Sequence, residues 1–87
     1  MDAELQKRIE QKIQETVSNR DEIKELFDSL SDVGDSKSFG LGIIMGRIYN
    51  AFYYHCKRLH KREPTKEEFD DFLKFVKSKK SEIESLW

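Results

Sequence analysis

The sequence has little that would cross-link the chain or hold it in a membrane. Cys56 is the one cysteine, so no internal disulfide can form, and we expect a reducing, cytoplasmic setting. No run of about 18 uncharged apolar residues is present, because the best candidate contains Arg47 and Asn50. The first residues, MDAELQKRIEQ, lack the apolar segment of a signal peptide. The sequence therefore predicts no membrane association.

Residues that break helices are also scarce. The 87 residues include one proline and four glycines, while 38% are charged and 11% are aromatic. The charge exceeds that of an average globular domain, but this aromatic content is typical of a folded chain. We therefore predict one all-α domain spanning residues 1–87. A core of this size is small, which leaves room for stabilisation by oligomerisation.

Local signals divide this domain into helices. Asp2 is placed to cap a first helix, and Gly34 suits a left-handed residue after its end. Thr65 and Glu68 have the spacing of a capping box, directly after the break at Pro64. We predict an antiparallel three-helix bundle with a long central helix, the helices spanning about 2–31, 36–62 and 65–85.

The first of these helices has two interpretations. Positions 9, 13, 16, 20, 23, 27 and 30 advance in steps of four and three, which is a heptad seam. Asn19 and Glu22, however, have the spacing of a second capping box. Because the seam keeps its angular phase across residue 19, we favour one helix with a kink there. Two shorter helices are the alternative.

The central helix has two different faces when it is read at 100° per residue. Its expected core stripe comprises Leu41, Ile44, Ile48, Phe52, His55 and Leu59. The opposite side comprises Phe39, Gly42, Ile43, Gly46, Asn50 and Tyr53, and is called the glycine face below. Two in-phase glycines predict close contact with another helix, either the first helix or a second copy of the chain. Alternatively, Gly40 and Gly42 belong to a loop and the helix begins near Leu41.

The glycine face leads to the favoured functional hypothesis. One chain folded as a bundle cannot cover both sides of the central helix. We therefore predict a small intracellular interaction module that is not an enzyme and has no small-molecule substrate. Its partner would be a second copy, giving a homodimer, or a helix of another protein.

Charge supplies an alternative hypothesis. Residues 1–35 carry a net charge of −5, from ten acidic and five basic side chains, and residues 36–87 carry +4, from seven acidic and eleven basic. Basic and aromatic residues gather toward the end of the central helix: Arg47, Tyr54, Lys57, Arg58, Lys61 and Arg62. Such a stripe could bind nucleic acid by neutralising phosphates and stacking on bases.

Catalytic and metal sites have weaker support in the sequence. Carboxylates cluster at helix starts, where they favour the helix dipole, and no catalytic residue is predicted. His55 points about 100° away from Cys56, so these two and His60 are not expected to converge on one ion. The sequence predicts no metal site and no cofactor. We expect His55 to be a core histidine whose ring nitrogens are both hydrogen-bonded.

Overall fold

A computed structural model describes residues 1–29 and 34–85, except for the side chain of Ser36. These residues form five helices: α1 (Ala3–Ser18), α2 (Arg20–Asp28), α3 (Ser36–His60), α4 (Lys66–Ser78) and α5 (Lys80–Glu84). No strand occurs among them, so the prediction of an all-α fold is confirmed. None of the helices in these two segments is both long enough and apolar enough to cross a bilayer. Leu30, the last position of the heptad seam, falls outside the described residues.

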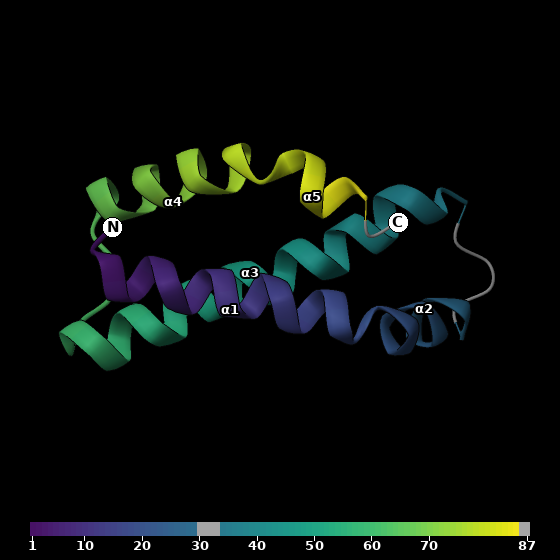
Figure 1. Ribbon diagram of the computed structural model, residues 1–87, viewed down its shortest axis with the longest axis horizontal. Coiled ribbons are helices and arrows are strands. Elements are labelled where there is room, and N and C mark those ends of the chain that lie inside the picture. The colour runs from purple at the N-terminus through teal and green to yellow at the C-terminus, as the bar shows by residue number, and fades with distance from the viewer. Residues whose placement is uncertain (30–33, 86–87) are drawn as a thin grey trace.

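The five helices form three rods, and each rod runs antiparallel to the one before it in the chain (Figure 1). α1 and α2 make the first rod, α3 returns along it, and α4 with α5 makes the third rod. α3 packs mainly against α1, and the molecule measures 40 × 23 × 22 Å. This arrangement is the predicted bundle, with its first and third rods each interrupted once.

Side-chain caps start the helices where the sequence places them. Asp2 accepts a hydrogen bond from the backbone N–H of Leu5 at 2.8 Å, and Asp35 accepts one from Ser38 at 3.1 Å. Thr65 and Glu68 form the expected reciprocal capping box. The prediction of a left-handed residue at Gly34 is wrong, because the positive φ among the described residues occurs at Lys61, which ends α3.

The first rod is interrupted at one residue, Asn19. Its backbone, at φ −98° and ψ 15°, is not extended as an N-cap should be, and its side chain caps nothing. The predicted capping box from Asn19 to Glu22 is therefore absent. The backbone hydrogen bonds continue on both sides, from Asn19 to Glu15 and from Ile23 to Asn19. The first rod therefore consists of two helices, and the two-helix alternative is correct. Because the angular phase of the side chains is almost unbroken at Asn19, the heptad seam continues into α2 and its buried side stays in line with that of α1.

The third rod is interrupted at Lys79, which the sequence did not predict. Its backbone dihedral angles, φ −100° and ψ 8°, resemble those of Asn19. The N–H of Lys79 reaches the carbonyl of Val76, a tighter step than the α-helical one. The turn redirects the short α5 so that Ile83 is buried.

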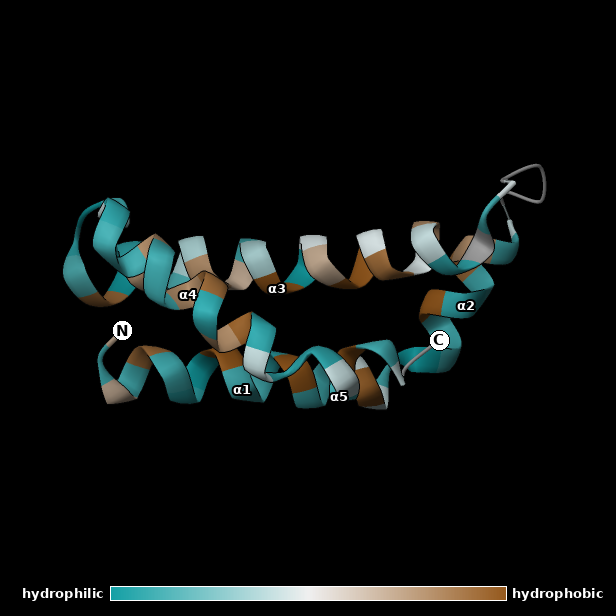
Figure 2. Ribbon diagram, turned by 90° about the horizontal axis from the view of Figure 1, so that it is seen from above, coloured by the Kyte–Doolittle hydropathy of each residue, from teal (hydrophilic) through white to brown (hydrophobic). Residues whose placement is uncertain are grey.

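The core lies between α3 and the other rods. It comprises Leu5, Ile9, Ile13, Ile44, Ile48, Phe52, Cys56, Phe72 and Ile83. The rings of Phe52 and Phe72 stack at 4.3 Å and 14°, which joins α3 to α4. The apolar members of the predicted stripe therefore face the core, whereas His55 lines a groove between α1 and α3. The apolar segments of α3 face α1 in Figure 2.

Candidate functional site

The glycine face of α3 is not covered by the described parts of the chain. Gly42, Gly46 and Asn50 are exposed, while Phe39, Ile43 and Tyr53 are half-buried. A Cβ atom built on either glycine would meet nothing within 4 Å. The predicted close contact of these glycines with the first helix is therefore wrong, because α1 packs on the opposite stripe. The contact with a second copy stays a prediction.

The alternative that the glycines belong to a loop is also wrong. α3 begins at Ser36, so both Gly40 and Gly42 lie in its first two turns. Glycine inside a helix costs about 1 kcal/mol relative to alanine. At Gly42 and Gly46 that cost is not explained by any packing within the described residues.

The two ends of this face differ in their surroundings. At one end Phe39 packs against Phe27 of α2, with ring centroids 5.5 Å apart. At the other end Tyr53 lies edge-on to Tyr49 at 5.6 Å, and Tyr49 in turn contacts Phe69 of α4. Between these aromatic ends lies the open glycine stretch, and none of the six residues of the face is charged. In Figure 2 no helix lies on this outer side of α3.

The basic-aromatic stripe does not form one surface. Arg47 and Tyr54 line a groove between α1 and α3, and the Arg58 guanidinium donates to the Tyr54 hydroxyl at 3.5 Å. Lys57 and Lys61 are exposed and do not line this groove. Arg62 is held at 2.6 Å by Glu68 and is the member of the stripe whose charge is neutralised by an ion pair.

Two basic residues of α1, Arg8 and Lys12, also line this groove, and the sequence analysis did not predict them as site residues. Its volume is about 490 Å³, and its lining residues are Arg8, Gln11, Lys12, Glu15, Arg47, Asn50, Ala51, Tyr54 and His55. Arg8 and Lys12 each pair with a glutamate of their own helix. Arg8 and Lys12 lie four residues apart and next to core residues of α1. This spacing could have predicted that both side chains lie beside α3.

Two nitrogen atoms in this groove have no hydrogen-bond partner among the described residues: Arg47 Nε and His55 Nδ1. The prediction that both nitrogens of His55 are satisfied is therefore wrong. Burial, together with the positive charges of Arg8 and Lys12, lowers the pKa of His55. The groove thus holds two unpartnered nitrogens beside basic side chains, of which Arg8 and Lys12 are paired with glutamates.

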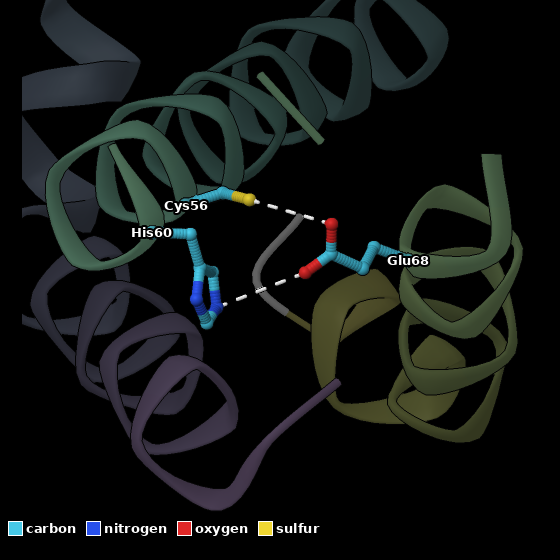
Figure 3. A group of neighbouring side chains, drawn as sticks. All are labelled: Cys56, His60 and Glu68. Atoms are coloured by element: carbon cyan, nitrogen blue, oxygen red, sulfur yellow. Dashed lines mark hydrogen bonds and ion pairs between the residues drawn. The ribbon is translucent and has the colours of Figure 1, made fainter. Parts of the chain in front are cut away.

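A second polar cluster lies where α3 ends and α4 begins (Figure 3). Cys56 and His60 project from α3 toward the carboxylate of Glu68, the third residue of α4. The Cys56 thiol donates to Glu68 Oε1 at 3.8 Å, and His60 Nε2 lies 3.7 Å from Glu68 Oε2. Hydrogen bonds from the Arg62 guanidinium and the Thr65 backbone lower the pKa of Glu68 to about 2. Burial, followed by the charge of Glu68, raises the pKa of the Cys56 thiol.

The relative directions of His55, Cys56 and His60 were predicted correctly from helix geometry, but the contact of Cys56 and His60 with Glu68 was not predicted. His55 faces the groove with α1, whereas Cys56 and His60 face α4. The capping box could have predicted the contact with Glu68, because it starts α4 soon after Lys61. The short connection then brings the first turn of α4 beside the last turn of α3. The donor atoms of Cys56, His60 and Glu68 all lie within 4.8 Å of one another, so these residues could hold a metal ion.

Comparison with known proteins finds no matching family model, no matching curated protein and no matching solved structure.

Proposed function

We propose that this chain is a small, non-enzymatic helical interaction module of the cytoplasm that self-associates through the glycine face of α3. The observation that supports the proposal is the open pair Gly42 and Gly46, for which no part of the described chain supplies a packing partner. Small residues one turn apart let two helix backbones approach closely, which compensates for the cost of glycine in a helix.

A second copy is the partner that best fits this face. The face contains both a depression, at the glycines, and apolar side chains beside it, at Phe39, Ile43 and Tyr53. In a two-fold interface the same patch meets itself, so the side chains of one copy would fill the depression of the other. The absence of charge from the six residues favours such a contact, because like charges would otherwise oppose each other across the axis.

Asn50 would lie near the centre of this interface. It is exposed in the single chain, one turn after Gly46 on the same face. Paired across a two-fold axis, the two amides can each donate to the other, as buried asparagines do where they fix the register of paired helices. Asn50 would thereby select one crossing of α3 on α3.

Light scattering on purified protein over a micromolar concentration series tests the proposal. We expect the mass to approach twice that of one chain, and Gly46→Leu to return it to the monomer because the side chain fills the depression. Lys7→Leu, at an exposed position of α1, is the matched control and should leave association unchanged. A monomeric mass for the wild type at every concentration would refute self-association.

The groove between α1 and α3 favours a second candidate, the binding of nucleic acid. Arg47 and Tyr54 both line this groove, together with Arg8 and Lys12 of α1. The Nε of Arg47 has no hydrogen-bond partner among the described residues. Guanidinium and ammonium groups would contact phosphates, and the exposed Tyr54 ring could stack on a base. The expected site is thus smaller than the predicted stripe and includes residues of two helices.

Binding of a fluorescent single-stranded oligonucleotide at about 50 mM salt tests this candidate. Affinity should fall steeply as salt is added, and Arg47→Gln should weaken binding, whereas Lys57→Gln, outside the groove, should have little effect. No binding at low salt, or equal losses from both variants, would eliminate the groove as a nucleic-acid site.

A further inference from the structure

Three rods meet at the end of the molecule that contains the N-terminus, and each contributes a side chain that can bind a metal. Asp2 directly precedes α1, Cys56 and His60 lie in the last two turns of α3, and Glu68 lies in the first turn of α4. Cys56 and His60 stand four residues apart, a spacing that places two ligands on one side of a helix. Thiolate, imidazole and carboxylate together are ligands that zinc accepts in proteins.

Three donor atoms lie close enough together to share one ion. Bond lengths of about 2.0–2.3 Å and tetrahedral angles imply separations of about 3.3–3.5 Å between ligand atoms. The observed separations are 3.8 Å from Cys56 Sγ to Glu68 Oε1 and 3.7 Å from His60 Nε2 to Glu68 Oε2. The donor atoms of Cys56, His60 and Glu68 all lie within 4.8 Å of one another.

Asp2 lies beside His60 but outside the group whose donor atoms are all within 4.8 Å of one another. Its Oδ1 is used to cap α1, whereas Oδ2 lies 2.7 Å from His60 Nε2. His60 Nε2 nevertheless has no hydrogen-bond partner among the described residues, so this short approach lacks the angle of an N–H···O bond. A buried nitrogen beside two carboxylates and without a hydrogen bond has the surroundings of a ligand atom.

The neighbours of this group would hold it in place. Arg62 and the Thr65 backbone N–H both donate to Glu68 Oε1, at 2.6 Å and 2.9 Å, which leaves Oε2 for an ion. Cys56 is fully buried, and the side chain of Glu68 is 15% exposed. Hydrogen bonds that orient a ligand and partial exclusion of water are both features of metal sites in proteins.

We propose that Cys56, His60 and Glu68 bind one divalent transition-metal ion of the zinc type. The thiolate and imidazole select such an ion over magnesium and calcium, which prefer oxygen ligands only. With three protein ligands, the ion would keep its fourth position for water and would link α3 to α4 at this end of the bundle. The site lies apart from the glycine face, so it does not depend on self-association.

Cobalt titration of reduced, chelator-treated protein tests the site. One Co²⁺ per chain should bind and give a thiolate-to-cobalt charge-transfer band, which Zn²⁺ then displaces. Cys56→Ala should abolish the band, and His60→Gln should weaken Zn²⁺ binding, measured by competition with a chromophoric chelator, by at least about tenfold. Circular dichroism establishes that each variant remains helical, and His60→Gln serves if the buried cysteine cannot be replaced.

Two further variants separate ligands from neighbours. Asp2→Asn keeps the helix cap but removes the carboxylate charge beside His60, so it should weaken Zn²⁺ binding less than His60→Gln does. Glu67→Gln, the exposed neighbour of Glu68, is the matched control and should bind Zn²⁺ as the wild type does. The proposal is overturned if wild-type protein gives no charge-transfer band, or if His60→Gln binds Zn²⁺ unchanged. A loss from Asp2→Asn as large as the loss from His60→Gln would contradict a site made of Cys56, His60 and Glu68.

Discussion

At the scale of single residues, three polar side chains start helices by capping them. Asp2, Asp35 and Thr65 each accept a hydrogen bond from the backbone N–H three residues ahead. Asn19 has the same chemistry but does not cap, because the surrounding helical phase holds its backbone out of the extended region. A cap can therefore be predicted from the sequence only where the neighbouring elements leave the backbone free to extend.

Asp35 gives a prediction for the dependence of stability on pH. The backbone N–H and hydroxyl of Ser38 lower its pKa below the ordinary value of 3.8, so the folded state binds this proton less readily than the unfolded state. The stabilisation is complete above pH 3.8 and is lost as the pH falls through the lower folded value. Asp35→Asn keeps a cap but cannot titrate. In urea unfolding, the variant should therefore lose less stability than the wild type below that pH, and parallel curves would contradict the assignment.

Gly46 gives a prediction that distinguishes the single chain from its assembly. A methyl group at this position meets nothing within 4 Å, so Gly46→Ala should raise the free energy of unfolding of dilute, monomeric protein by about 1 kcal/mol. Urea unfolding at low protein concentration measures it, with Gly42→Ala as a parallel case. A destabilised alanine variant under these conditions would mean that the position is packed within the chain.

At the scale of helices, the heptad seam predicted which side of the first rod is buried but not where the helix is interrupted. Ile9, Ile13 and Ile23 are buried on one side because the interruption at Asn19 preserves the hydrogen bonds around it. The interruption at Lys79 could not be predicted locally. The Lys79 ammonium lies 3.0 Å from Glu10 of α1, a contact that exists only once the third rod packs on the first.

The short α5 should matter to stability through Ile83. Its side chain belongs to the core, so Ile83→Ala should lower the free energy of unfolding by about 2–5 kcal/mol. Leu73, on α4, is 48% exposed, and Leu73→Ala is the matched control with an expected loss below about 1 kcal/mol. Thermal or urea unfolding compares them, and equal small losses would show that α5 does not dock.

At the scale of the whole molecule, the sequence predicted three antiparallel rods and a central helix with two distinct faces. It did not predict which residues of different rods would meet. Arg8 lies beside Arg47, and Glu68 beside Cys56, through packing between rods, which local spacing indicates only once the arrangement of the rods is known. The basic stripe failed as one surface for the same reason, since Arg62 is paired with a residue of the next helix. The outer side of α3 is not covered by α1, α4 or α5.

The most direct test of self-association through that side is cross-linking at its centre. Asn50→Cys places a thiol next to the proposed two-fold axis, while the native Cys56 is fully buried. Under mild oxidation, we expect this variant to form a disulfide-linked dimer much faster than Lys7→Cys, whose thiol would also be exposed but would lie on α1, outside the glycine face. Equal, slow cross-linking of the two variants would contradict the proposed interface.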